Sequence, residues 1–550
     1  MTVRTAAQVF VDQLAACGVT KIFGNPGTTE YAVLDAVRER DDVEFVLCLH
    51  EGVAVSAAAG YARASGQVGV VELHAGPGLG NGLGMIYDAW AGQTPLVVYV
   101  GQGDQSTLYL EPTLGADLVG MATPVTKWAY EIRTPDEVAQ VVRRAMKVAH
   151  TPPYGPVVLS LPMDVSEQPS AGAVTAPSAL RHRLRPDADA LAEAAELLLA
   201  ADAPLIVPGD GVARSGALAE VGRLARLVGA PIRGGTMSET AIEPGEPLTA
   251  DRLHFGGEEA RAVLARYDVV VAVGTKVFTQ LFPLPGDPAP GCRIIHIGLD
   301  AWELGKSHPS TLVAGDERQC LAELADLVEL KLDETRAARA ADRRRSLETS
   351  LAQAASQALA ADRQRWDESP MTPARACFEI TRAMPEDACV VDEAITTQGV
   401  FYRYFTPQPG RWFRARGGGI GEGLPMALGV QAARPGTPVV ALTGDGSSMY
   451  SLTAYWTAAH HELPVVWVVL NNATYRILQD NAVRRRPAAQ AQDPVLATSL
   501  QGPEIDHAAV ARGLGCAGVR VTEPAELGSA IHDALASGRP TVIDLVLAPR

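Results

Sequence analysis

The sequence predicts an α/β protein built from three doubly wound parallel-sheet domains in tandem. The chain has 550 residues, and apolar strand-like runs alternate with helix-like segments along most of it. Two stretches interrupt this alternation: residues 166–185 are rich in Ser, Pro and Ala, and residues 329–366 are charged and helix-prone. We interpret both stretches as connectors, which places the domains at residues 1–168, 186–330 and 367–550.

In the first domain, strands and helices are expected to alternate from the start. A helix over residues 5–17 ends at a glycine, and the capping-box pattern TPDE opens a later helix at residue 134. Strands are expected at residues 21–23, 43–49, 68–73, 96–100 and 156–161. Helical segments between these runs would provide the crossovers that parallel strands need.

The second and third domains repeat this rhythm. Strands are expected at residues 205–207, 231–233, 269–273 and 293–297, and then at 438–443, 464–470 and 541–547. None of the glycine-rich loops fits GxGxxG with an acidic residue at the proper distance, so a nicotinamide site is disfavoured.

Composition excludes several classes of function. No apolar run is long enough to cross a bilayer, and residues 1–18 lack a secretory leader, so we expect a cytoplasmic protein without a membrane partner. The net charge of −16 argues against nucleic-acid and anionic-membrane partners. The seven cysteines form no CxxC pair, so neither a disulfide framework nor a zinc site is expected.

A candidate metal site follows two strands of the third domain. The sequence Gly444-Asp445-Gly446 follows one strand and Asn471-Asn472 follows the next. The carboxyl ends of parallel strands lie side by side, so Asp445 and Asn472 should meet there. A carboxylate and an amide oxygen suit a hard divalent cation that also holds a phosphate. Two unrelated turns would use the same residue types.

Two further candidates follow strands of the first domain. Glu51 lies between an apolar strand and an alanine-rich helix, where it either complements the helix dipole or faces a ligand. His74 precedes the glycine-rich residues 75–84, where it either transfers protons or caps the loop. The residues alone leave both choices open.

The GDG and NN pair, separated by residues 447–470, resembles the signature of thiamine-diphosphate enzymes. Four other segments extend the resemblance over nearly the whole chain. LHEGVAVSAAAGYARASG resembles the family's pyrimidine-binding segment, and GNPGTTE, VELHAGPGLGNG and RGGGIGEGLPMALGVQ resemble its motifs GNPGSNE, INLHSAAGTGNA and AGGLGFALPAAIGVQ. The resemblance is nearest to benzoylformate decarboxylase within the acetolactate-synthase-like group.

The resemblance implies that the chain binds thiamine diphosphate and Mg²⁺. Asp445, Asn472 and the backbone carbonyl of Thr474 would bind the metal. The residues implied to seat the diphosphate end of the cofactor are Thr396, Thr397, Gly446, Ser447 and Tyr475. The pyrimidine ring would be bound by the carbonyl of Gly418 and the amide of Ile420, with the Ile420 side chain wedged under the bent cofactor. Glu51 would hydrogen-bond the ring and promote its imino tautomer.

The resemblance also implies roles around the substrate. His74 would handle protons, and Thr28 would meet the substrate carboxylate. The substrate pocket would be lined by Asn25, Thr28, Leu281, Ile477 and Asn481. Some positions depart from the family: GTKVFTQLFPLPG lacks the histidine of the decarboxylases, with Leu281 in its place, and STSTT becomes EAITT.

The implied function is non-oxidative decarboxylation of a 2-oxo acid, in an obligate homodimer that often assembles further into a tetramer. Four alternatives stay open. The first is a carboligase, similar to acyloin or acetolactate synthases, that joins the acyl group to a second carbonyl compound. The second is a 2-hydroxyacyl-CoA lyase, because the middle domain of relatives can bind ADP-like groups. The third is an oxidoreductase with a dinucleotide such as FAD in the middle domain. The fourth is a catalytically silent relative, against which the retained Glu51, Asp445 and Asn472 argue.

Overall fold

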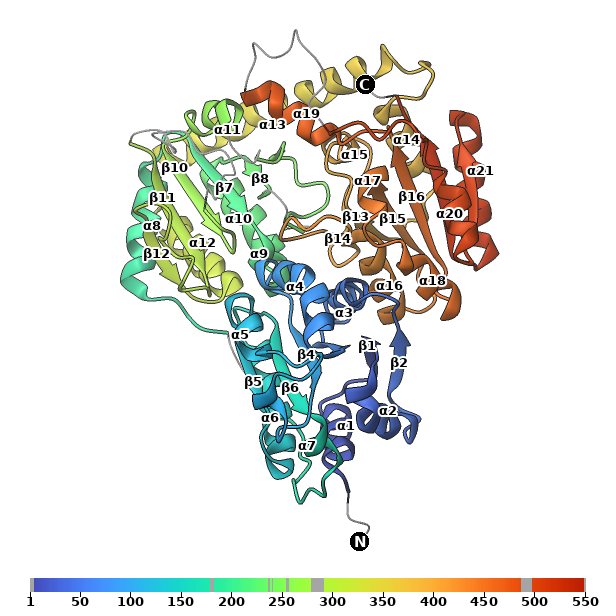
Figure 1. Cartoon of the computed structure of the whole chain (residues 1–550). Helices are drawn as coiled ribbons and strands as arrows, with labels where there is room; N and C mark the ends of the chain where they lie inside the picture. The colour runs from blue at the N-terminus through green and yellow to red at the C-terminus, as the bar shows by residue number, and fades with distance from the viewer. Residues whose placement is uncertain are drawn as a thin grey trace.

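The computed structural model confirms the predicted α/β architecture. It describes residues 4–178, 183–235, 238–239, 241–253, 257–277, 291–485 and 497–548. The described residues form three six-stranded sheets in which all paired strands are parallel, and helices cover both faces of each sheet (Figure 1).

The first sheet has the strand order β2-β1-β3-β4-β6-β5. Its strands are β1 (Lys21–Asn25), β2 (Glu44–Leu47), β3 (Gly69–Leu73), β4 (Leu96–Gln102), β5 (Trp128–Glu131) and β6 (Val157–Pro162). Its helices are α1 (Ala6–Ala16), α2 (Tyr31–Arg38), α3 (Glu51–Ser65), α4 (Ala75–Ala91), α5 (Leu118–Ala122), α6 (Val138–Ala149) and α7 (Met163–Glu167). Thr5 caps α1 with the reciprocal Thr5–Gln8 hydrogen bonds of a capping box.

The third sheet repeats the first, with the order β14-β13-β15-β16-β18-β17. Its strands are β13 (Cys389–Asp392), β14 (Trp412–Arg414), β15 (Val439–Gly444), β16 (Val465–Asn471), β17 (Ala517–Val521) and β18 (Thr541–Val546). Its helices are α14 (Pro373–Ala383), α15 (Gln398–Phe401), α16 (Gly423–Ala433), α17 (Asp445–Ser448), α18 (Thr453–His460), α19 (Arg476–Arg485), α20 (His507–Gly513) and α21 (Pro524–Ser537). If β13 is counted as the first strand of the third sheet, the strand order of this sheet is the same as that of the first sheet.

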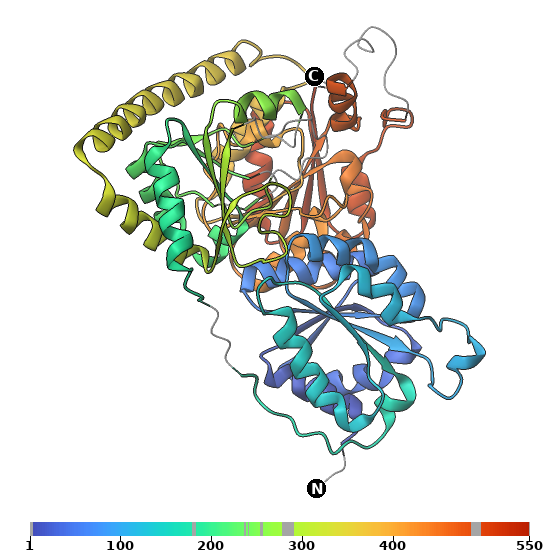
Figure 2. The same cartoon turned by 90° about the vertical axis from the view of Figure 1, so that its left-hand side faces the viewer.

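The middle sheet has the order β12-β11-β10-β7-β8-β9, which is the strand order of dinucleotide-binding folds. Its strands are β7 (Pro204–Pro208), β8 (Ile232–Arg233), β9 (Thr249–Ala250), β10 (Val269–Val273), β11 (Arg293–Gly298) and β12 (Thr311–Ala314). Its helices are α8 (Ala188–Ala200), α9 (Asp210–Ser215), α10 (Leu218–Val228), α11 (Gly257–Leu264) and α12 (Glu317–Lys331). The connector predicted at residues 329–366 contains the long helix α13 (Glu334–Arg363), which runs along the outside of the molecule (Figure 2).

The first and third domains share one hydrophobic core, whereas the middle domain has its own. The shared core joins buried residues of α3 to buried residues of α16. The two helices cross with their backbones in contact: a β-carbon on Gly60 would overlap the carbonyl oxygen of Met426, and one on Gly429 would overlap that of Ala57. Glycine at both positions therefore permits the close approach.

The seven cysteines are free thiols, most of them buried. Among the described residues, no helix combines the length and the apolar character needed to cross a membrane.

The helix crossing predicts that Gly429→Ala destabilises the protein, by about 1–3 kcal/mol or more, because the added methyl group has no space. Gly528→Ala on α21 is the matched control: a β-carbon there meets nothing within 4 Å. The control should gain about 0.5–1 kcal/mol from the higher helix propensity of alanine. Urea unfolding measures both changes, and equal stability of the two variants would contradict the described crossing.

Candidate active site

Glu51 is held by two amide side chains at the start of α3. It is the first residue of the helix and is 7% exposed. Its Oε1 accepts a hydrogen bond from Asn25 Nδ2 at 3.4 Å, and its Oε2 accepts one from Asn81 Nδ2 at 3.1 Å. Asn25 ends β1 and Asn81 lies on α4, so three elements converge on one carboxylate.

His74 pairs with a buried carboxylate. It follows β3 and is the N-cap residue of α4. Its Nδ1 lies 2.8 Å from Glu30 Oε2, and Glu30 is fully buried. A carboxylate acceptor at Nδ1 places the proton on Nδ1, which leaves Nε2 for acid–base chemistry. A β-carbon on Gly27 would overlap the imidazole ring, so the turn before Thr28 needs glycine there.

Glu72, one residue before the end of β3, is a buried carboxyl group between these two sites. It is 1% exposed, and neither of its oxygens has a hydrogen-bond partner among the described residues. Burial, together with the negative charges of Glu30 and Glu51, raises the pKa of Glu72 to about 9. Glu72 is therefore a neutral acid at pH 7.

Asp445 and Asn472 follow the adjacent parallel strands β15 and β16. The Asp445 carboxylate faces the backbone amides of residues 472–474 and accepts a hydrogen bond from Gly446 N at 2.8 Å. Burial raises the pKa of Asp445, and these amides oppose the rise. Its Oδ2 is buried without a hydrogen-bond partner among the described residues, and a cavity of about 310 Å³ lies beside it. An anionic oxygen without a partner beside a cavity fits a bound cation.

The loop at residues 416–423 is held by carboxylates. Gly419 N donates to Asp88 Oδ1 at 3.0 Å, and Gly421 N and Gly423 N donate to the two oxygens of Glu393 at 2.5 and 3.0 Å. Burial raises the pKa of Glu393 to about 7, against the lowering effect of these two amides. Burial, with the charge of Glu422, raises the pKa of Asp88 to about 8.

The carbonyl of Gly418 and the amide of Ile420 in this loop are available for a ligand. Within the described part of the chain, neither the carbonyl of Gly418 nor the amide of Ile420 makes a protein hydrogen bond. Gly418 has φ +98°, a conformation that favours glycine. These are the two groups that the resemblance assigns to the pyrimidine ring, so the loop fits that role.

The other predicted site residues lie near these elements. Thr28 is exposed on a short 3₁₀ helix at residues 28–30, and the neighbouring Thr29 is the threonine within 3.3 Å of His74 Nδ1. Thr396 is exposed and Thr397 is buried in the turn before α15. Ser447 is half-buried on α17.

Three more of the predicted residues lie on or next to α19. A β-carbon on Gly446 would overlap the ring of Tyr475, which therefore packs on that glycine. Ile477 and Asn481 are half-buried on α19, where their spacing of four residues places them on one face. Leu281 lies outside the described residues.

Sequence reasoning missed Glu30, Glu72 and Asn81. Glu30 and Asn81 lie inside the quoted segments GNPGTTE and VELHAGPGLGNG, so position within a motif was an available signal. Glu72 also lies there, where the family motif has asparagine, and the acid in an otherwise apolar strand marked it.

We predict that Glu72→Gln stabilises the protein increasingly as pH rises. Between the ordinary pKa of 4.5 and the folded value of about 9, the folded state keeps a proton that the unfolded state releases, so wild-type stability falls with pH. The glutamine variant lacks this loss, so its advantage should grow by up to about 1.4 kcal/mol per pH unit in that window. Urea unfolding from pH 5 to 9 measures it. Glu386→Gln, at an exposed position, is the control and should show no such trend.

Three models of one protein family match this chain. They are described as the thiamine pyrophosphate enzyme N-terminal TPP binding domain at residues 4–120, the central domain at 191–324 and the C-terminal TPP binding domain at 396–545. Each match falls on one of the three sheets. The N-terminal match contains Glu51 and His74, and the C-terminal match contains Gly418, Asp445 and Asn472.

Individual relatives agree with these matches. Benzoylformate decarboxylase of Pseudomonas aeruginosa is 31% identical over 545 residues, which cover 96% of each chain. A probable acetolactate synthase large subunit of Methanocaldococcus jannaschii is 28% identical, over 99% of this chain and 92% of the relative. The thiamine diphosphate-dependent 4-hydroxybenzoylformate decarboxylase of Rhodococcus jostii RHA1 superposes with a TM-score of 0.85 at 28% identity, over 99% of both chains. The chain belongs to the thiamine pyrophosphate enzyme family.

Proposed function

We propose that this enzyme uses thiamine diphosphate and Mg²⁺ to remove CO₂ from a 2-oxo acid. The observation that carries the proposal is the loop at residues 416–423: carboxylates bind the amides of Arg416, Gly419, Gly421 and Gly423, while the Gly418 carbonyl and the Ile420 amide are left for a ring. When bound, thiamine diphosphate supplies a nucleophilic carbon and accepts the electrons of the broken carbon–carbon bond.

The third domain would hold the diphosphate end of the cofactor. The Asp445 carboxylate, with Oδ2 free of protein hydrogen bonds in the described residues, would bind Mg²⁺ together with the Asn472 side chain and the Thr474 carbonyl. Gly446, Ser447, Thr396, Thr397 and Tyr475 would surround the phosphates. Asn472 Oδ1 already accepts a hydrogen bond from Thr474 N at 3.1 Å, which fixes the orientation of the amide.

The first domain would supply the groups that move protons. Asn25 and Asn81 fix the Glu51 carboxyl group, which would hydrogen-bond the pyrimidine ring and promote its imino tautomer. Glu30 holds Nδ1 of His74, so Nε2 would deliver or remove the proton at the substrate. Thr28 would bind the substrate carboxylate beside Asn25. Leu281, Ile477 and Asn481 would complete the pocket.

We also propose that the active unit is a homodimer, because one chain separates the two halves of this site. Asn81 contacts Glu51, whereas Asp88, seven residues further along α4, contacts Gly419. Seven residues of helix span about 10 Å, which separates the Glu51 carboxylate from the Gly418 loop of its own chain along α4. A second chain would bring its Glu51 to that loop.

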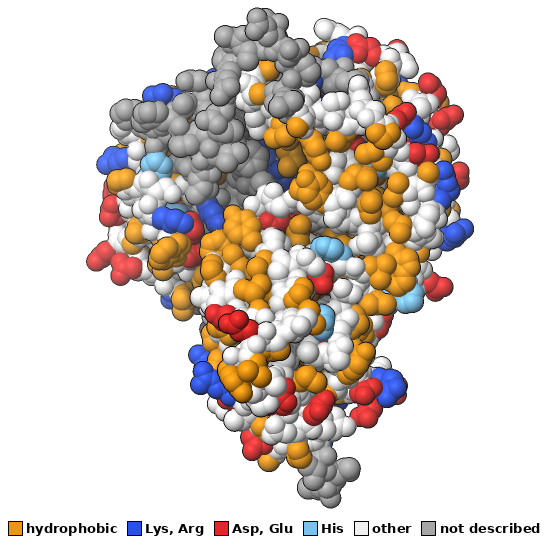
Figure 3. Space-filling view, in the orientation of Figure 1, with side chains coloured by type: hydrophobic (Ala, Val, Ile, Leu, Met, Phe, Trp, Pro, Cys, Tyr) orange, Lys and Arg blue, Asp and Glu red, His pale blue; other side chains and the backbone are white. Residues whose placement is uncertain are grey.

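The surface supports this assembly. Leu49, Tyr87 and Tyr450 expose 43%, 43% and 60% of their surface, and hydrophobic side chains gather on the face where the first and third domains meet (Figure 3). Sedimentation should give a dimer or a tetramer; a stable monomer with full activity would refute the proposal.

A carboligase is the second candidate. The family includes acetolactate synthases that resemble this chain over nearly their whole length, and the segment GTKVFTQLFPLPG has no histidine to protonate a released aldehyde. The acyl group would then pass to a second carbonyl compound. A 2-hydroxyacyl-CoA lyase would need a nucleotide site in the middle domain.

The product profile separates these reactions. The protein is incubated with pyruvate, benzoylformate and branched 2-oxo acids, with and without acceptor aldehydes, and CO₂, aldehydes and hydroxyketones are quantified. We expect CO₂ and aldehyde without an acceptor. Aldehyde as sole product when an acceptor is present would exclude the carboligase, and a hydroxyketone as main product would favour it over the decarboxylase.

Glu51→Gln tests cofactor activation. The variant should bind thiamine diphosphate with Mg²⁺ as the wild type does, because the Asp445 site is intact. Exchange of the proton on C2 of the cofactor, followed by NMR in D₂O, should slow by at least about tenfold. Glu39→Gln, at an exposed position after α2, is the control. Unchanged exchange in Glu51→Gln would refute the role of Glu51 in cofactor activation. If the wild type bound no thiamine diphosphate, the proposed enzymatic function would be refuted.

A further inference from the structure

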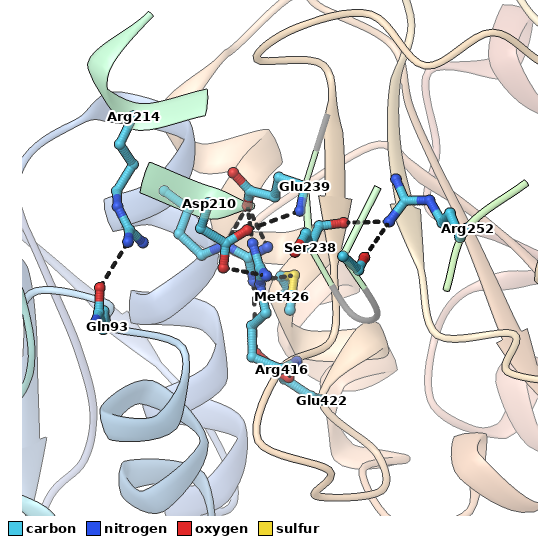
Figure 4. A network of polar contacts seen from close by, with 11 residues as sticks. Gln93, Asp210, Arg214, Ser238, Glu239, Arg252, Arg416, Glu422 and Met426 are labelled. Carbon is cyan, nitrogen blue, oxygen red and sulfur yellow. Dashed lines mark hydrogen bonds and ion pairs between the residues drawn. The ribbon is translucent and has the colours of Figure 1, made fainter. Parts of the chain in front are cut away.

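A buried network of charged side chains lies where the three domains meet (Figure 4). Arg416 NH1 lies 2.5 Å from Asp210 Oδ2, and Arg416 NH2 lies 3.4 Å from Glu239 Oε1. Arg416 belongs to the third domain, whereas both carboxylates belong to the middle domain. The Arg416 side chain is 6% exposed, so its charge is neutralised by protein and not by water.

The first domain joins this network through Arg63 on α3. Its guanidinium pairs with Glu239, with Nε at 2.9 Å from Oε1, and its NH1 lies 3.8 Å from Glu422 Oε1. Although burial raises the pKa of Asp210 and of Glu239, the neighbouring arginines lower both values overall. The two carboxylates are therefore ionised at neutral pH.

The same arginine begins the loop with the two open groups. Arg416 N donates to Glu422 Oε2 at 2.6 Å, which ties the two ends of the loop together. Gly417, Gly418 and Gly419 follow directly, and the first two have positive φ. Three glycines in succession have little intrinsic preference for one conformation, so anchors at the ends of the loop decide where its carbonyl and amide groups point.

Contacts from the middle domain to this region are polar. The middle domain has its own hydrophobic core, separate from the core that the other two domains share. Polar contacts join it to the first domain as well: Gln93 accepts a hydrogen bond from Arg214 and donates one to Asp300. Among these contacts, the Asp210–Arg416 pair lies next to the three glycines, because Arg416 directly precedes Gly417.

We propose that Asp210 and Glu239 of the middle domain are positioning residues for the pyrimidine-binding loop and act on it through Arg416. The identity of the ligand that the loop binds rests on the proposed function. The link between the middle domain and the loop does not depend on it. Without its acceptors, Arg416 would be a buried cation and would turn toward water. The glycines would then lose their fixed conformation, and the Gly418 carbonyl and Ile420 amide would no longer converge on one ring.

The network uses a residue that departs from the family motif. In AGGLGFALPAAIGVQ a phenylalanine stands where this chain has Glu422. Glu422 is 3% exposed, and burial raises its pKa, against the attraction of Arg63. A buried acid at this position requires the two arginines, which in turn require the carboxylates of the middle domain.

The test compares Asp210→Asn with Glu246→Gln in the full-length protein. Asparagine keeps the shape of the side chain but removes the charge that holds Arg416. Glu246 is a buried carboxylate that pairs with the exposed Arg226 inside the middle domain, so its glutamine variant controls for the loss of a buried carboxylate away from the loop. Glu239→Gln is the second variant, in case Asp210→Asn does not fold.

The first readout is hydrogen exchange of the loop amides without cofactor. Exchange at Gly419, Gly421 and Gly423 should rise at least about tenfold in Asp210→Asn and stay near wild type in Glu246→Gln. The second readout is titration with thiamine diphosphate and Mg²⁺, where the dissociation constant should rise about tenfold or more in Asp210→Asn alone. In the double variant Asp210→Asn/Arg416→Gln, the rise in loop exchange and in the dissociation constant should be smaller than the sum of the rises in the two single variants. The reason is that both substitutions remove the same Asp210–Arg416 interaction.

Each outcome decides a separate point. If Asp210→Asn leaves loop exchange at the wild-type rate, or if Glu246→Gln raises it equally, the positioning role is overturned. If loop exchange rises in Asp210→Asn but wild-type protein binds no thiamine diphosphate, the proposed function fails while the link between the middle domain and the loop stands. If exchange rises and the affinity for the cofactor is unchanged, the loop does not bind the ring, and positioning of a cofactor is refuted.

Discussion

The contact between α3 and α16 is the constraint on which the rest of the structure depends. Two glycines let the helix backbones touch, and the hydrophobic core that surrounds them belongs to two sheets of identical topology. Glu51 is the first residue of α3, and the glycine loop leads directly into α16. A shift of either helix would therefore move a carboxylate or a loop of the proposed site. The packing between the first and third domains therefore determines the geometry of the proposed site.

Carboxyl groups are used in two different ways around the site. Glu30, Asp88 and Glu393 accept hydrogen bonds that fix a histidine or a backbone amide. Glu72 has no hydrogen-bond partner in the described residues and is neutral, because burial and two nearby acids make its ionisation unfavourable. Burial also raises the pKa of Asp88 and of Glu393, so Glu72 differs from these acids in lacking hydrogen-bond partners within the described part of the chain and not in its burial.

The sequence predicted the central strands well because they are continuous apolar runs, such as VVWVVL in β16. It did not indicate β5, β9, β12, β14 and β17, which lie at the edges of their sheets and are short or partly exposed. It also did not indicate β13, which is buried but only four residues long. Glu51, His74, Asp445 and Asn472 were identified as candidate site residues because each of them follows an expected strand. Glu30 and Asn81 lie inside quoted motifs but were not assigned a role. Asp88 was not predicted, because a contact between a loop and a helix face depends on how domains and crossovers pack, which local patterns do not encode.

Arg416 limits how freely the parts of this chain can be exchanged with those of a relative. A middle domain from another member of the family would have to supply carboxylates at the positions of Asp210 and Glu239 to fit the third domain of this chain. A chimera without them would leave Arg416 buried without these two acceptors, at a cost of about 3–5 kcal/mol. Although the three domains form separate sheets, they cannot be exchanged independently. A sequence change in the middle domain at Asp210 or Glu239 requires a matching change at Arg416.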